Sequence, residues 1–188
     1  MSKYTLIVPI AADTDKMGTE MPYLFGLDSN GLMYCVKSIM GLPLEAFSDI
    51  YFTILHKHNL RYKLLEMMQI QFERLGIAHK THVYELWEST SSQPETLYHT
   101  VVGNHITGAV LFKDGDSYFT TEVYPENMLY IFPLDGLQVV NPQNKSYVTI
   151  DEQYYITNII EKKIVSRFFC AGGYSIEDVQ DFVLEYEK

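Results

Sequence analysis

Residues 109–116 read Ala-Val-Leu-Phe-Lys-Asp-Gly-Asp, a short apolar run that ends abruptly in two aspartates. An apolar run of this length, bounded by a turn signal, is typical of a β-strand that is buried on both faces. Two similar runs precede it, at Tyr4–Ala12 and Asp49–Leu55, and Thr81–Leu86 is a further candidate strand. The sequence therefore predicts four strands, three of them buried, with Ala109–Lys113 as the last.

Helical patterns lie between these strands. We predict helices at Leu32–Met40, Asn59–Leu75 and Glu95–Val102, and the second has apolar residues at helical spacing. Asn59 is expected to cap that helix and Gly76 to end it. Strands that alternate with helices favour parallel pairing through right-handed crossovers. The predicted fold class is α/β: a three-layer α/β/α domain with a Rossmann-like mixed sheet.

The chain changes character after Asp116. Segments rich in aromatic and β-branched residues replace the strand–helix alternation, which predicts further strands. We expect one domain over residues 1–188 with a β-rich second part. The predicted elements are strands at Tyr118–Val123, Met128–Leu134, Tyr147–Ile150, Tyr155–Ile160 and Ile164–Ala171, and a last helix at Ile176–Tyr186.

Composition limits the partners. The formal net charge is -10, and an acidic surface repels a phosphate backbone, so nucleic acid is not an expected partner. No stretch of about 18 apolar residues occurs, so we expect no membrane span and a cytoplasmic location. Cys35 and Cys170 are far apart and form no CxxC pair, which predicts two free thiols rather than a zinc site.

Asp114 and Asp116 are the strongest chemical signal. Ligands of open α/β sheets bind beyond the carboxyl ends of the strands, where this pair is expected to lie. Carboxylate oxygens suit Mg²⁺ or Mn²⁺, and either ion can hold nucleotide phosphates. Gly115 allows a close approach of backbone and ligand. The tripeptide alone is equally compatible with an ordinary acidic turn.

Several short motifs occur in a familiar order. Val8–Ala12 is followed by a polar loop that contains Lys16, and Ser91–Thr96 precedes the aspartate pair at residues 114–116. Ile160-Glu161-Lys162 and Gly172-Gly173-Tyr174 follow later. In this order the motifs resemble those of the sugar-phosphate nucleotidyltransferases, and the resemblance runs from about Tyr4 to the last helix.

The resemblance implies a role for each matching residue. Lys16 and Asp116 would be catalytic, and Asp116 with Asp114 would bind Mg²⁺ or Mn²⁺. The nucleotide would contact Ala11, Ala12, Gln93 and Asp114, and the sugar phosphate would contact Glu161, Lys162 and Gly173. The implied activity joins a nucleoside triphosphate to a sugar phosphate and forms a nucleotide-diphospho-sugar, as in polysaccharide biosynthesis. Whether the chain forms a homo-oligomer is a question that the resemblance leaves open.

Some positions depart from the family pattern. Asp13 and Asp15 stand where glycines are expected, Tyr23 stands where a lysine follows proline, and Lys163 stands where a proline is expected. The two loop acids would repel a triphosphate, and a neutral tyrosine cannot neutralise it. Two alternatives are therefore kept: a metal-dependent glycosyltransferase that acts on a nucleotide sugar, and a non-catalytic relative that binds a nucleotide or sugar phosphate.

The remaining aromatic and imidazole side chains carry weaker signals. His56-Lys57-His58 follows the second strand, and we interpret it as a surface turn rather than a metal site. We interpret Trp87 as a core or rim residue rather than as a platform for a nucleobase.

Overall fold

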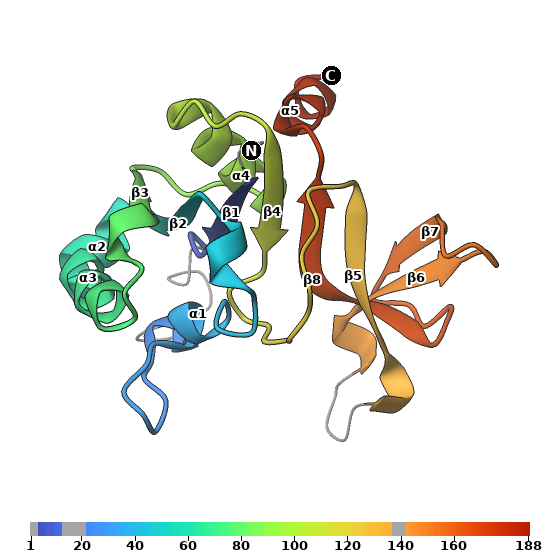
Figure 1. The fold of residues 1–188 in the computed structure, drawn as a ribbon, viewed down its shortest axis with the longest axis horizontal. Helices are drawn as coiled ribbons and strands as arrows, with labels where there is room; N and C mark the ends of the chain where they lie inside the picture. The colour runs from blue at the N-terminus through green and yellow to red at the C-terminus, as the bar shows by residue number, and fades with distance from the viewer. Residues whose placement is uncertain (1–3, 13–21, 137–141) are drawn as a thin grey trace. The chain divides into compact units, whose positions relative to one another are not determined.

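The structure is a computed structural model, and it describes residues 4–12, 22–136 and 142–188 (Figure 1). The chain divides into two compact units. Unit 1 comprises Met1–Asn127 and Ser175–Lys188, and unit 2 comprises Met128–Tyr174. The expectation that residues 1–188 form one domain stays a prediction.

Unit 1 contains the predicted parallel strands. They are β1 (Tyr4–Pro9), β2 (Asp49–Leu55), β3 (Thr81–Leu86) and β4 (Ala109–Lys113). Their order is β3-β2-β1-β4, and each neighbouring pair is parallel. The predictions for β2, β3 and β4 are confirmed to the residue, and β1 ends three residues before the predicted limit. The Rossmann-like α/β class is confirmed.

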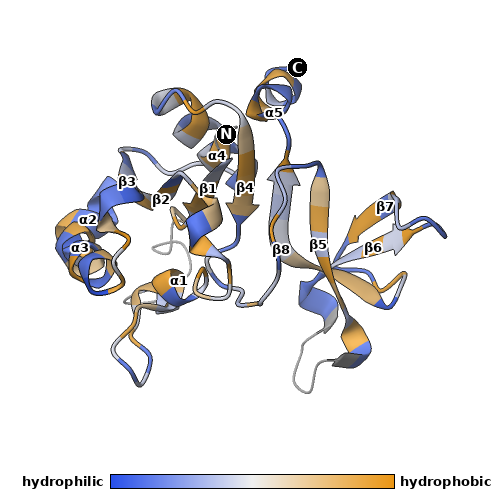
Figure 2. Ribbon diagram, in the orientation of Figure 1, coloured by the Kyte–Doolittle hydropathy of each residue, from blue (hydrophilic) through white to orange (hydrophobic). Residues whose placement is uncertain are grey.

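The central strands are apolar on both faces. Leu6, Ile7 and Val8 of β1 are fully buried, as are Val110 and Leu111 of β4. Figure 2 shows apolar residues along β1, β2 and β4. A strand covered on both sides needs consecutive apolar residues rather than alternating ones, and this explains why its limits could be read from the sequence.

Helices cover both faces of this sheet. Phe52 of β2 stacks on Phe72 of α3 (Leu64–Arg74), with ring centroids 5.4 Å apart. The next residue, Thr53, faces the other way and bonds to Thr100 of α4 (Gln93–Gly103). Successive strand residues point to opposite faces, so α3 and α4 lie on opposite sides. Unit 1 therefore has three layers, and α5 (Val179–Tyr186) packs beside α4 (Figure 1).

Two predicted helices differ from the structure. The predicted helix at Asn59–Leu75 is two helices, α2 (His56–Tyr62) and α3, because Lys63 adopts a left-handed conformation with φ 56°. The Asn59 side chain accepts a hydrogen bond from the Leu65 amide at 3.0 Å, so it supports the start of the second helix. The predicted surface turn at residues 56–58 is instead the first turn of α2, and His58 is buried. The helix predicted at Leu32–Met40 is only α1 (Tyr34–Lys37).

Unit 2 is built from strands, and the two pairings of its strand β6 (Ser146–Ile150) are antiparallel. It also holds β5 (Met128–Pro133), β7 (Ile156–Glu161) and most of β8 (Phe168–Ile176). β6 pairs antiparallel with both β7 and β8, and β5 also pairs with β8. The β-rich second part is thus confirmed, but the last strand begins four residues later than predicted.

The strand predicted at Tyr118–Val123 is wrong, because residues 117–127 form neither strand nor helix. The segment is fixed at its start by Lys113, whose ammonium donates to the Ser117 carbonyl at 2.5 Å. The Phe119 backbone then lies so close to Gly41 that an added Cβ would meet its carbonyl oxygen at 2.1 Å. These contacts hold the segment against unit 1 without a strand partner.

Over the ranges that the structure describes, no helix has both the length and the apolar character needed to cross a membrane. Short 3-10 turns connect the longer elements at Tyr23–Phe25, Leu44–Ala46, Ala78–Lys80, Leu134–Gly136 and Pro142–Asn144.

The buried hydroxyl pair between β2 and α4 gives a test of this packing. Thr53 Oγ1 and Thr100 Oγ1 lie 2.6 Å apart, and Thr100 Oγ1 also bonds to the Thr96 carbonyl at 2.7 Å. We expect Thr100→Val to lower the free energy of unfolding by about 1–3 kcal/mol, because it leaves the Thr53 hydroxyl unsatisfied. Urea denaturation measures the loss. In the Thr53→Val/Thr100→Val double variant the loss should be smaller than the sum of the single losses, and additive losses would contradict the contact.

Candidate nucleotide-binding site

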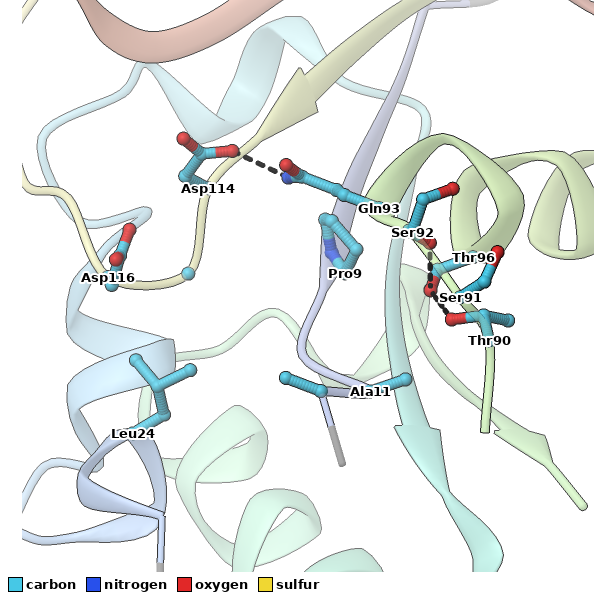
Figure 3. Close-up of a pocket in the computed structure, with 12 residues that line it drawn as sticks. Pro9, Ala11, Leu24, Thr90, Ser91, Ser92, Gln93, Thr96, Asp114 and Asp116 are labelled. Carbon is cyan, nitrogen blue, oxygen red and sulfur yellow. Dashed lines mark hydrogen bonds between the residues drawn. The ribbon is translucent and has the colours of Figure 1, made fainter. Parts of the chain in front are cut away.

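The main cavity lies where the direction of strand addition reverses. The chain adds β2 and β3 on one side of β1 and then places β4 on the other side, so β1 and β4 flank a topological switch point. Ligands of open α/β sheets bind at such a point, beyond the carboxyl ends of the strands. A cavity of about 480 Å³ opens there. Its lining residues are Pro9, Ala11, Ala12, Leu24, Thr90, Ser91, Ser92, Gln93, Thr96, Asp114, Gly115 and Asp116 (Figure 3).

The turn after β4 brings both aspartates to this cavity. Gly115 packs so closely on the end of β1 that an added Cβ would lie 2.5 Å from Cγ2 of Ile10. A glycine is therefore needed for the turn to approach β1. Asp114 and Asp116 flank it and line the same cavity, as Figure 3 shows.

The start of α4 forms the opposite wall of the cavity. Ser92 caps the helix, since its hydroxyl accepts from the Glu95 amide at 3.3 Å. Glu95 in turn accepts from the Ser91 amide at 2.5 Å and the Ser91 hydroxyl at 2.7 Å. Pro94 has no amide hydrogen. Because the helix end is capped by its own residues and carries a carboxylate, it is a poor site for a phosphate.

A hydrogen bond joins the two walls. The Gln93 amide nitrogen donates to Oδ1 of Asp114 at 2.6 Å (Figure 3). This bond orients the Asp114 carboxylate and also orients the Gln93 amide. Asp114 thereby takes one of the two N–H donors of Gln93, and the second N–H and the side-chain oxygen are the groups that a ligand would use.

Tyr23 contacts the second aspartate. Burial, the negative charge of Asp116 and a hydrogen bond to that carboxylate together raise the pKa of Tyr23 to about 12. The phenol is therefore neutral near pH 7 and donates to Asp116. Tyr23 and Asp116 also line a smaller hollow of about 160 Å³ with Lys37.

The nearby lysines are held by other partners. Lys113 is fully buried, and its ammonium donates to Ser117 Oγ at 2.7 Å and to the Asp114 carbonyl at 2.8 Å. Lys37 is paired with Asp28 at 2.9 Å. No lysine or arginine lines the main cavity among the residues whose placement is described. Binding of a phosphate here would therefore need a metal cation or a side chain outside those residues.

The two carboxylates suit a magnesium ion. Mg²⁺ is commonly held by one or two carboxylates together with substrate phosphates, rather than by a complete set of protein ligands. Asp114 and Asp116 are separated by one glycine and share the cavity, so they fit that donor set. In the described portion of the chain, no cluster of three His, Cys, Asp or Glu side chains could hold a metal by itself.

The structure brings together five of the residues singled out from the sequence: Ala11, Ala12, Gln93, Asp114 and Asp116. Lys16 lies outside the described residues, as do Asp13 and Asp15. The three residues assigned to the sugar phosphate lie in unit 2. There Glu161 and Lys162 are exposed and form an ion pair at 2.9 Å, and Gly173 is buried in β8.

Two contacts of the site were missed by sequence reasoning. The capping role of Ser92 could have been found, because Ser followed three residues later by Glu is a helix-start signal. The bond between Tyr23 and Asp116 joins residues far apart in the chain, and no local pattern announces it.

Several solved structures that are similar to this chain are named as pyrophosphorylases or nucleotidyltransferases. A nucleoside-diphosphate-sugar pyrophosphorylase from Vibrio cholerae RC9 has a TM-score of 0.74 and 18% identity, over 97% of this chain and 77% of that chain. An inositol-1-phosphate CTP transferase from T. maritima has a TM-score of 0.70 and 12% identity, over 100% and 76%. A UDP-glucose pyrophosphorylase complexed with UDP-glucose has a TM-score of 0.67 and 13% identity, over 100% and 80%. No family model and no curated protein matches the sequence.

These likenesses establish the class of fold. The chain has the fold of the sugar-phosphate nucleotidyltransferases, as its motifs implied. At 12–18% identity the likeness shows the fold and does not by itself assign an activity.

The Tyr23–Asp116 contact predicts a titration shift. Asp116→Asn removes a negative charge that opposes phenolate formation, so the pKa of Tyr23 should fall from about 12 toward 10, with the part due to burial remaining. NMR of protein labelled with ¹³C at tyrosine Cζ measures it, and Tyr23→Phe identifies the resonance. If that resonance titrates identically in both proteins, Tyr23 does not contact Asp116.

Proposed function

We propose that this chain is a nucleotidyltransferase that binds a nucleoside triphosphate and Mg²⁺ in the cavity at Asp114 and Asp116. The observation that carries the proposal is the position of these two carboxylates at the switch point of a nucleotidyltransferase fold. The likeness to enzymes named for nucleotide sugars and a sugar-like phosphate supports a sugar phosphate as the second substrate. The product would be a nucleotide-diphospho-sugar of the kind used in polysaccharide biosynthesis in the cytoplasm.

The proposed reaction exchanges one phosphorus–oxygen bond for another. A phosphate oxygen of the sugar phosphate attacks the α-phosphorus of the triphosphate. The bond from that phosphorus to the oxygen bridging to the β-phosphate breaks, and pyrophosphate leaves with the electron pair. No redox step is involved, so the protein has to position the reactants and neutralise charge.

Each part of the cavity has a proposed task. Asp116 and Asp114 would hold Mg²⁺, which when bound supplies positive charge to the phosphates. Ala11 and Ala12 at the end of β1 and Gln93 at the start of α4 would contact the nucleoside. Lys16, outside the described residues, would stabilise the leaving pyrophosphate. Outside this cavity, Glu161, Lys162 and Gly173 of unit 2 would bind the sugar phosphate, as the family motifs imply.

One observation favours a second candidate, a non-catalytic relative that binds a nucleotide or sugar phosphate. Tyr23 stands where the family pattern has a lysine, and it donates a hydrogen bond to Asp116. A neutral phenol holds this carboxylate but adds no positive charge to a reacting phosphate. In the non-catalytic case the cavity would bind ligand without turnover, whereas in the catalytic case pyrophosphate is released. The metal-dependent glycosyltransferase that acts on a nucleotide sugar stays an alternative, because its aspartate pair needs no triphosphate loop.

A thermal-shift panel tests the binding step. Nucleoside triphosphates and nucleotide sugars are added with and without Mg²⁺, and the Tm is recorded. At 100 times its Kd, a ligand of the native state should raise stability by about 2.7 kcal/mol. For a chain of this size, that gain corresponds to a Tm increase of roughly 5–11 °C. A panel in which no triphosphate raises the Tm, with or without Mg²⁺, would rule out the proposed function.

Asp116→Asn is the matched variant for the metal. We expect it to weaken Mg²⁺-dependent nucleotide binding at least tenfold, about 1.4 kcal/mol, because one of two carboxylate ligands is lost. Asp181→Asn removes an exposed charge from α5 and should leave that affinity unchanged. Isothermal titration calorimetry gives both affinities. Equal binding by both variants would show that the aspartate pair is only a turn. A pyrophosphate-release assay then separates the catalytic from the non-catalytic candidate.

A further inference from the structure

Trp87 is the single tryptophan of the chain, and it lies in water. It is 78% exposed, and none of the large apolar side chains in the described ranges is more exposed. Of the two positions that the sequence left open for Trp87, the core is therefore wrong, and the rim is compatible with its exposure. Leaving a large aromatic surface in water costs free energy that burial would recover, so its position calls for a physical reason.

A chain of contacts holds this side chain in place. The Trp87 ring stacks on the His56 ring, with centroids 3.9 Å apart and planes inclined by 29°. His56 Nδ1 lies 2.7 Å from Oε2 of Glu85, which also accepts a hydrogen bond from Nδ2 of the Asn59 side chain at 3.2 Å. The indole is thus supported from below by a ring whose orientation is itself fixed. A fixed aromatic surface loses little conformational entropy when a ligand stacks on it.

The platform lies at the same edge of the sheet as the cavity. Ala11, which lies two residues after β1, forms one buried cluster with Leu55 and Leu86, the last residues of β2 and β3. The next residue after each of them is Ala12, His56 and Trp87 respectively. Ala12 lines the cavity. Pro9 of β1 and Tyr84 of β3 both pair with Thr53 of β2, and neighbouring strands are about 4.8 Å apart, so the ends of β1 and β3 lie roughly 10 Å apart. A nucleoside is long enough to bridge this separation.

The charges of the cavity indicate that the base of a bound nucleotide would lie toward β3. Asp114 and Asp116 follow β4, on the far side of β1 from β3, so a Mg²⁺-bound triphosphate would lie toward β4. The segment from Trp87 to Gln93 leads from β3 to the cavity, and the capped start of α4 offers little to a phosphate. A nucleotide whose phosphates lie at the aspartates would therefore extend its base toward β3.

We propose that the exposed face of Trp87, supported by His56, is a stacking platform for the planar base of the nucleotide that binds in the cavity. The inference rests on the proposed function and adds to it the place and the chemistry of base recognition. Stacking on an aromatic ring tolerates any base, because every base has a π-face. Discrimination between bases would then come from hydrogen bonds such as those available to Gln93.

Tryptophan fluorescence tests the stacking directly, because Trp87 is the only tryptophan. The probes are ATP, GTP, CTP, UTP and dTTP with Mg²⁺, each also added as its free nucleoside, and Mg²⁺-pyrophosphate as the probe without a base. We expect saturable quenching by the nucleotide that raises the Tm, and none by pyrophosphate. His56→Ala should reduce the quenching, because it removes the support of the indole.

Affinity measurements separate stacking from general apolar contact. Trp87→Leu removes the π-face and should weaken binding of that nucleotide by about 5–150-fold, the range measured for loss of base stacking. Trp87→Phe keeps an aromatic face and should retain most of the affinity. Tyr154→Leu removes an aromatic side chain from unit 2 that is 77% exposed and should change nothing.

The outcomes distinguish this inference from the function on which it rests. If a triphosphate raises the Tm but leaves Trp87 fluorescence unchanged, or binds equally to Trp87→Leu, the stacking platform is wrong and the proposed function stands. If no triphosphate raises the Tm, both fall together. If Trp87→Leu and Trp87→Phe lose affinity equally, an aromatic face does not account for the contribution of Trp87, and the stacking platform is wrong.

Discussion

The pairing of β1 with β2 on one side and β4 on the other is the constraint on which the rest of unit 1 depends. Ile7 pairs with Tyr51 and with Phe112, so β1 is hydrogen-bonded along both edges. Because all three strands are parallel, their carboxyl ends meet at one edge. The segments that follow them must leave the sheet there and separate, and the main cavity lies between them. Moving β4 to the other end of the sheet would remove the switch point and the cavity with it.

How far the sequence could predict this structure depended on whether local rules decide each feature. The limits of β2 and β4 follow from apolar runs bounded by polar residues, which is a local property. The break between α2 and α3 does not, because Lys63 takes a left-handed conformation that usually belongs to glycine. The segment after Asp116 has the residue types of a strand, yet Lys113, buried and bonded to Ser117, holds it out of the sheet. Tertiary contacts override propensity there.

The residues of the candidate site also differ in whether local sequence or tertiary contacts determine their positions. The aspartate pair could be located because it directly follows a predicted buried strand, and the strand's place in a parallel sheet fixes where its end lies. Gln93 was suggested by resemblance, whereas its bond to Asp114 spans 21 residues and depends on how α4 packs. For Trp87 the sequence left a core or a rim position open, and its exposure excludes only the core. Its ring stacks on His56, the first residue of α2, and this contact joins two segments that are far apart in the chain.

The charges of the cavity then restrict how a nucleotide could bind. Two unit charges of the same sign at about 4 Å repel by roughly 4 kcal/mol at an effective dielectric constant near 20. Two carboxylates facing a triphosphate therefore oppose binding unless a cation lies between them, and a divalent ion reverses the sign of the interaction. Lys113 cannot serve, because its ammonium already donates to three oxygen atoms of residues 114 and 117. The acidic wall thus favours phosphate only together with a metal, whereas the other described residues that line the cavity carry no charge.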